Sequence, residues 1–182
     1  MRFAKPLKMP GKFPLKLILT LAVSLGHFMA GAQEAEPEAK LKAVFIYNFT
    51  KYIEWHESAP SDFVIGVAGR SAVRELLLDI SKANKAQNRN IVVREFSKPE
   101  EIEHCNILFI SESFPYPLRS VMSRVDAGMV TVTEKPGYAS LGADFNFVIV
   151  NDKLKFEVNI DAINQSQVKV SSQLLKLAII VE

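Results

Sequence analysis

Short apolar strands that alternate with helical segments constrain the fold of this chain more than any other feature. Four runs rich in Val, Ile and Phe are typical of strands: "FVIGV" (63–67), "NIVVREF" (90–96), "NILFI" (106–110) and "MVTVTE" (129–134). Helical segments are predicted between them, the first starting with Ser71 as N-cap and Glu75 in its first turn. This alternation predicts an α/β fold, a single layered domain with parallel strand pairs and flanking helices.

The end of the chain predicts a different kind of pairing. The segments "FNFVIV" (145–150) and "KLKFEVN" (153–159) flank the dipeptide Asn151-Asp152, a two-residue hairpin signal. Apolar and charged residues alternate in the second strand of the hairpin, so one face of this strand is exposed to solvent. We therefore expect a C-terminal β-hairpin near the sheet edge, which makes the sheet mixed. The last segment, "SSQLLKLAIIVE" (171–182), is predicted as a terminal helix, with a buried strand as the alternative.

The first 32 residues have the pattern of a secretory signal peptide. They hold five basic residues and no acidic one, then an apolar run (17–30), and end in Ala30-Gly31-Ala32. The run is shorter than the roughly 20 residues that span a bilayer, so an uncleaved anchor is the weaker alternative. We expect cleavage after Ala32, export without later membrane insertion, a flexible tail at 33–38 and one domain at 39–182.

Charge and cysteine content exclude several classes of protein. Without the five basic residues of the signal, 17 basic and 20 acidic residues remain, a net charge of −3, so the basic footprint of a nucleic-acid-binding protein is absent. Cys105 is the only cysteine, so no disulfide forms within the chain; we expect it to be a small buried hydrophobe rather than a reactive thiol.

No motif indicates an enzyme, a cofactor or a metal site. The sequence lacks G-x-S-x-G, H-E-x-x-H and the P-loop, and beyond the signal only His56 and His104 are present. We therefore predict no catalytic residue and no cofactor, and favour a binding protein.

The helix predicted at 39–55 carries most of the aromatic residues of that region. On a helical wheel, Phe45, Phe49, Tyr52 and Ile53 fall in one wide apolar arc, which predicts core packing. The opposite side of the helix and its C-terminal end carry four residues that we interpret as partner contacts. The alternative is that their rings only pack along the domain surface with their polar ends in water. These residues are Tyr47, Lys51, Trp55 and His56.

The apolar residues of the last segment point in nearly every direction if the segment is helical. A terminal helix of one domain is seldom buried on all sides, so one side is expected to stay exposed until a partner covers it. We predict that Leu177 and Ile180, with the exposed side of the first helix, form a dimer or partner surface.

The stretch "GVAGRSAV" (66–73) is the one candidate for a small ligand. Gly66 and Gly69 lie at a predicted strand-to-helix junction, where Arg70 could face an anion at the N-terminus of the helix. Ordinary βα turns use the same residues. The alternative function is therefore that of a small-ligand sensor, specific for an anion.

Four stretches together resemble the YfiR-like family of periplasmic regulators. They cover most of the chain after the signal: "LKAVFIYNFTKYIEW" (41–55), "CNILFIS" (105–111), the long stretch 130–159 and "KVSSQLLKLAIIV" (169–181). The resemblance implies an α/β protein that dimerises. It also implies repression of an inner-membrane diguanylate cyclase through the cyclase's periplasmic sensor region, which lowers cyclic di-GMP and biofilm formation.

The chain departs from that family in its cysteines. Several family members have two disulfides, and Cys105 matches one of the positions, but its partner is missing. Ala139 and Asn146 stand about where the second pair is expected. Redox sensing through disulfides is therefore not implied for this chain.

Overall fold

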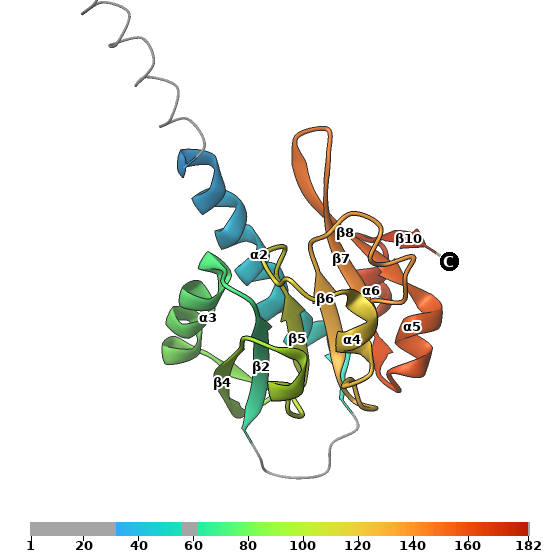
Figure 1. Cartoon of the computed structure of the whole chain (residues 1–182), viewed down its shortest axis with the longest axis horizontal. Coiled ribbons are helices and arrows are strands. Elements are labelled where there is room, and N and C mark those ends of the chain that lie inside the picture. The colour runs from blue at the N-terminus through green and yellow to red at the C-terminus, as the bar shows by residue number, and fades with distance from the viewer. Residues whose placement is uncertain (1–31, 56–61, 182) are drawn as a thin grey trace, which may run out of the picture. The chain divides into compact units, whose positions relative to one another are not determined.

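A mixed β-sheet forms the centre of the domain (Figure 1). The computed structural model describes residues 32–55 and 62–181, so the predicted signal peptide and His56 lie outside the described residues. The strands of this sheet are β2 (Phe63–Ala68), β3 (Lys85–Ala86), β4 (Arg89–Phe96), β5 (Ile107–Ile110), β6 (Val130–Thr133), β7 (Phe145–Val150), β8 (Lys153–Asn159) and β10 (Ile179–Val181). Their order is β10-β8-β7-β6-β5-β2-β4-β3.

The pairing of the strands confirms the predicted mixed sheet. β4-β2-β5-β6-β7 run parallel to their neighbours, and β10 is parallel to β8. β7 and β8 form the predicted antiparallel hairpin, one strand from the edge. Its two turn residues, Asn151 (φ 52°) and Asp152 (φ 57°), adopt the left-handed conformation that a two-residue hairpin with a type I′ turn requires.

Helices cover both faces of the sheet. The helices are α2 (Ala32–Tyr52), α3 (Ala72–Ala83), the 3₁₀ turn η1 (Pro99–Glu101), α4 (Leu118–Met122), α5 (Ile160–Gln165) and α6 (Ser172–Leu175). Residues of α2, α3 and α6 join one buried cluster, and residues of α4 join a second cluster on the other face. In Figure 1, α2 passes behind the sheet and α4 lies in front of it. A separate two-stranded sheet pairs β1 (Ile53–Glu54) with β9 (Lys169–Val170).

Side-chain caps explain where three of the helices begin. Ser71 accepts a hydrogen bond from the Val73 N–H and starts α3, as predicted. Asn159 caps α5 in the same way, and Ser171 caps α6.

The buried stripe of α2 is narrower than the wheel predicts. Ile46, Phe49 and Ile53 are fully buried, and the Phe49 ring stacks on Phe145 with centroids 4.5 Å apart. Tyr52, placed by the wheel in the core, is instead 39% exposed. The reason is geometric: a helix lying on a sheet buries only the stripe that faces the strands, whereas the apolar arc of this helix is wider than that stripe.

The two ends of the domain also differ from prediction. α2 begins at Ala32 and so includes 33–38, where a flexible tail was expected; this segment is rich in Ala and Glu, which favour helices. At the other end, α6 stops after four residues and β10 follows. The predicted terminal helix is therefore present but short, and the strand alternative holds for Ile179–Val181, whose β-branched residues pair with the free edge of β8.

Candidate functional site

Exposed apolar side chains gather along one side of α2. Among residues 36–55 and 62–181, seven large hydrophobic side chains are exposed, and only Leu141 (68% exposed) lies on another part of the domain, in the loop after β6. The other six come from α2, the β7–β8 hairpin, the turn after α6 and β10. They are Leu41, Val44, Tyr52, Ile149, Leu177 and Ile180.

Two hollows lie between α2 and the elements beside it. The first, which we call the acidic hollow, has a volume of about 440 Å³ and lies between the first turns of α2 and the hairpin. Its apolar wall is formed by Phe147, Ile149 and Leu154 of the hairpin together with Pro136. The second, the apolar hollow, has a volume of about 180 Å³ and is lined by Phe45, Asn48, Tyr52, Gln173, Leu174 and Leu177.

The hollows share one aromatic floor. The Phe45 ring, from the apolar hollow, lies 6.1 Å from the Phe147 ring of the acidic hollow and 5.6 Å from Phe156. We call the two hollows and their exposed rim the α2 groove.

The acidic hollow carries an excess of negative charge. Lys42 Nζ lies 2.6 Å from Glu134 Oε2 and 2.5 Å from Glu38 Oε1. The backbone N–H of Glu112 donates to Glu134 Oε1 at 2.7 Å, which places a third carboxylate on the rim. Burial alone would lower the pKa of Lys42, but Glu134 and Glu38 outweigh burial and raise the pKa above its ordinary value. Lys42 therefore stays charged, and three carboxylates face one ammonium group.

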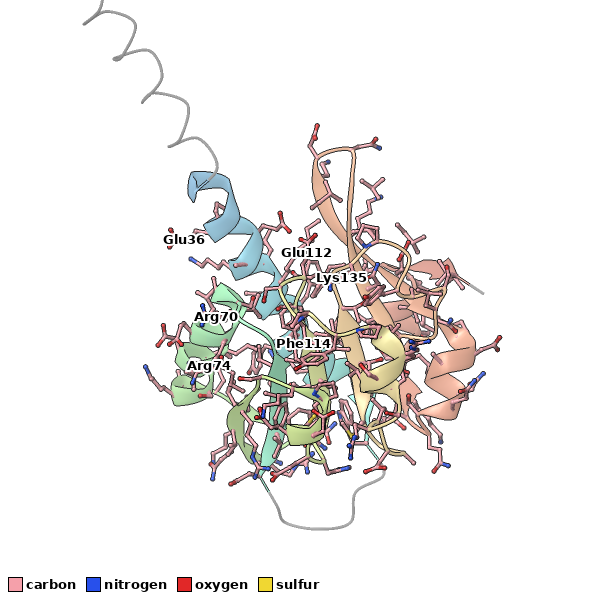
Figure 2. All side chains as sticks on the ribbon, in the orientation of Figure 1. Glu36, Arg70, Arg74, Glu112, Phe114 and Lys135 are labelled. Carbon is pink, nitrogen blue, oxygen red and sulfur yellow. The ribbon has the colours of Figure 1, made fainter. Side chains whose placement is uncertain are left out.

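The carboxylates Glu112 and Glu134 follow the carboxyl ends of the parallel strands β5 and β6. Figure 2 shows Arg70, Glu112 and Lys135 along the same edge, where parallel strands end. Lys135 is not among the residues that line the acidic hollow, and its Nζ donates to the Phe114 carbonyl at 2.9 Å.

The structure separates the predicted partner residues into different places. Leu177 lines the α2 groove, and Ile180 stands opposite Val158 of β8, on the sheet face that carries α2. Tyr47 faces α3 instead: its hydroxyl donates to Asn84 Oδ1 at 3.1 Å.

The remaining predicted partner residues also lie away from the groove. Lys51 is exposed, with its Nζ 4.1 Å from the centroid of the Tyr47 ring. The Trp55 ring packs edge-on against Phe63, with centroids 5.2 Å apart, so it is half-buried at the end of the core. Leu41, Val44 and Ile149 are surface residues that were not predicted. For Leu41 and Val44 the signal was the excess width of the apolar arc of α2, which one sheet face could not cover, whereas Ile149 lies in β7 outside that arc.

The predicted anion site lies at the carboxyl ends of parallel strands. A hollow of about 390 Å³ is lined by Gly69, Arg70, Glu95, Ser97, Ser113 and Pro115. The chain leaves β2 toward β4 and returns to β5 on the opposite side of β2, so the hollow lies at the point where strand order reverses. Ligands of open α/β sheets bind at such points.

Gly66 does not belong to this hollow. It lies in the middle of β2, where a Cβ would come within 2.7 Å of the Phe96 ring and 3.0 Å of the Cys105 sulfur. Close packing in the second core cluster accounts for a glycine at this position, and Gly66 is not among the residues that line the hollow. Gly69 has φ +86°, and a Cβ there would lie 2.7 Å from Ser111 Oγ. Gly69 thus lets the chain turn sharply out of β2.

The charges of this hollow are mixed. Arg70 is exposed, while its carbonyl accepts hydrogen bonds from Ser111 Oγ (3.2 Å) and Ser113 Oγ (2.7 Å). Glu95 also lines the hollow and pairs with Arg74 at 2.9 Å. The arrangement sets the exposed Arg70 guanidinium near the N-terminus of α3, with the Glu95 carboxylate lining the same hollow.

A buried polar cluster joins β6, β7 and α5. Asp144 Oδ2 accepts from Thr131 N (2.7 Å) and Thr131 Oγ1 (2.6 Å), and its Oδ1 accepts from Ser166 Oγ (2.6 Å). Burial raises the pKa of the Asp144 carboxyl, although these hydrogen bonds act in the opposite direction. Thr131 lies in β6 and Ser166 ends α5, so the cluster ties α5 to the sheet.

Cys105 is buried and unpaired, as predicted. Burial raises the pKa of its thiol to about 12, so the reactive thiolate is absent at neutral pH. Within the described ranges, no group of three His, Cys, Asp or Glu is placed to hold a metal ion. No helix in the same ranges is long and apolar enough to cross a membrane.

Comparison with known families gives one match over most of the domain. A family model described as YfiR/HmsC-like matches residues 39–179, from the first buried turn of α2 to the start of β10. The match includes the residues that line both hollows of the α2 groove, except Glu38, and all four stretches on which the resemblance rests, apart from two residues at the end.

Proposed function

The chain belongs to the YfiR/HmsC-like family of periplasmic regulators, and from this premise we propose that it represses an inner-membrane diguanylate cyclase. In this proposal the exported domain binds the periplasmic sensor region of the cyclase and lowers the level of cyclic di-GMP. The signal peptide would direct this export and be removed by cleavage after Ala32.

The observation that carries the proposal is the α2 groove. Scattered apolar residues are normal on a protein surface, but three exposed large hydrophobic side chains line the two hollows, and Leu41 and Val44 are exposed on α2 itself, which is the kind of patch that marks a protein interface. Leu177, 68% exposed, lines the apolar hollow rather than a core. The groove therefore supports a binding protein whose partner is another protein.

Repression requires that the domain bind two states of the cyclase unequally. A ligand shifts a conformational equilibrium only by its difference in affinity for the two states. To shift the ratio of active to inactive cyclase about tenfold, the domain must bind the inactive sensor region about 1.4 kcal/mol more tightly than the active one. Burial of roughly 60 Å² of additional apolar surface supplies that difference, which is less than a single large side chain.

The test is made in cells. Deleting the gene should raise cyclic di-GMP several-fold, and a plasmid copy should restore the level, as measured by mass spectrometry of nucleotide extracts. Co-purification from membranes should recover a diguanylate cyclase. Unchanged cyclic di-GMP on deletion would refute repression. Fractionation with N-terminal sequencing tests the predicted location and the cleavage after Ala32.

The family resemblance also leads us to propose a homodimer. Light scattering on the mature chain measures its molar mass directly. A mass of one chain at micromolar concentrations would reject the dimer and leave the regulatory proposal in place.

A second candidate function is anion sensing, favoured by the position of the Arg70 hollow at the reversal of strand order. Phosphates, nucleotides and amino acids at millimolar concentration should then raise the melting temperature. Arg70→Ala should abolish that rise, while Arg119→Ala, at an exposed arginine of α4, should leave it unchanged. If no compound stabilises the protein, this candidate is rejected.

A further inference from the structure

We propose that the α2 groove receives an amphipathic helix of the partner, with two apolar anchors about two turns apart and a Lys or Arg at one end. The inference rests on the proposed function for the identity of the partner as a cyclase segment. The chemistry of the occupant is argued from the groove itself.

The spacing of the hollows gives the spacing of the anchors. On α2, the acidic hollow is lined by Glu38 and Lys42, and the apolar hollow by Phe45, Asn48 and Tyr52. The two sets are centred about eight residues apart, which is about 12 Å along a helix axis. In a helix laid beside α2, residues i and i+7 share one face and lie about 10.5 Å apart. Two apolar side chains with that spacing reach both hollows, as in other helix-in-groove complexes.

The charge of the groove gives the orientation. Glu38, Glu112 and Glu134 outnumber Lys42 at one end, whereas the lining of the other hollow is uncharged. A bound apolar segment would remove water from these carboxylates, and uncompensated burial of charge is costly. A cationic side chain beside the first anchor offsets that cost. The basic end of the partner helix therefore lies at the hairpin end of the groove.

A second copy of this chain fits the groove poorly. To fill a concave surface, the copy must offer a projecting apolar side chain. Among the described residues, the one exposed large hydrophobic side chain outside the groove is Leu141. Two grooves placed face to face would leave both hollows open and set the carboxylates against uncharged or like-charged surfaces.

The experiment uses the purified mature chain and two synthetic helical peptides. One peptide carries leucines at positions i and i+7 with a lysine one turn before the first leucine; the other replaces the lysine by glutamate. Fluorescence anisotropy at low salt should show the lysine peptide binding at least fivefold more tightly than the glutamate peptide. Leu177→Glu should weaken binding of the lysine peptide at least tenfold.

Matched variants separate the two parts of the inference. Leu141→Glu places the same charge at an equally exposed leucine and should leave binding unchanged. Glu112→Lys should remove the preference for lysine, whereas Glu100→Lys, at an exposed position in η1, should keep it. Circular dichroism confirms folding, and Tyr52→Ala serves as a second groove variant if Leu177→Glu does not fold.

Any of the following outcomes would overturn the proposal of a partner helix in the α2 groove. Absence of binding by the lysine peptide, or binding that Leu177→Glu and Tyr52→Ala leave unchanged, removes the helix as occupant. A change of molar mass in Leu177→Glu, measured by light scattering, would make the groove an interface between copies. These results are independent of the cyclic di-GMP level in the deletion strain, so failure of repression and failure of the helix are told apart.

Discussion

Phe49 and Tyr52 lie less than one turn apart on α2, and truncation to alanine should lower stability much more at Phe49 than at Tyr52. Phe49 is fully buried, with its ring stacked on Phe145 and set edge-on against Phe156 at 5.4 Å. Tyr52 is exposed on the rim of the α2 groove. The pair therefore compares the core stripe of the helix with its outer stripe in the same element.

The magnitude follows from burial. Loss of a core Phe side chain lowers the free energy of unfolding by about 3–5 kcal/mol. Each lost aromatic pair accounts for about 0.5–1.5 kcal/mol beyond area burial, so we expect the upper half of that range for Phe49→Ala. Tyr52→Ala should lose about 1 kcal/mol or less, because much of its ring stays in water in both states. A domain of this size loses about 2–4 °C of melting temperature per kcal/mol, so Phe49→Ala should melt about 8–20 °C lower.

Urea unfolding of the mature chain, followed by circular dichroism, measures both variants. The slope with denaturant should stay constant, which shows that the change lies in stability rather than in the unfolded state. A loss below about 2 kcal/mol in Phe49→Ala, or an equal loss in Tyr52→Ala, would refute this division of α2 into a buried and an exposed stripe.

Three further predictions concern buried groups and the turn after β2. Because the folded pKa of Asp144 is raised, the stability that its carboxyl contributes is present at low pH and is lost as pH rises from about 3.8 through the folded pKa. The stability of Asp144→Asn relative to the wild type should therefore increase over that pH window, as measured by urea titrations. A difference that stays constant with pH would contradict the raised pKa. Cys105 should resist a fluorescent maleimide at pH 7 in the native protein and react completely in urea, and equal labelling in both conditions would contradict its burial. Gly69→Ala should lower the free energy of unfolding by about 1–3 kcal/mol more than Gly137→Ala does. Both glycines have positive φ, but only at Gly69 do other atoms occupy the place of a Cβ. Equal losses would mean that backbone strain alone accounts for the effect.

The sequence by itself determined the local elements of this domain. Alternating apolar strands and helices predicted the α/β fold, and Asn151-Asp152 predicted the hairpin, because both signals depend on residues that are neighbours in the chain. Ser71 marked the start of α3 for the same reason. The burial of Cys105 also followed from its place at the start of an apolar strand.

Only the tertiary structure decided which apolar surfaces stay exposed. The wheel grouped Tyr52 with Phe49, but the sheet has room for one stripe of α2, and the rest of the apolar arc lies at the groove. The last segment became β10 because β8 offered an open edge, a fact that no local pattern contains. Likewise the acidic hollow joins Lys42 to Glu134 across 92 positions of the chain. Helical and strand periodicity report the direction in which a side chain points, whereas its burial depends on what lies opposite, and that is set by contacts between residues distant in sequence.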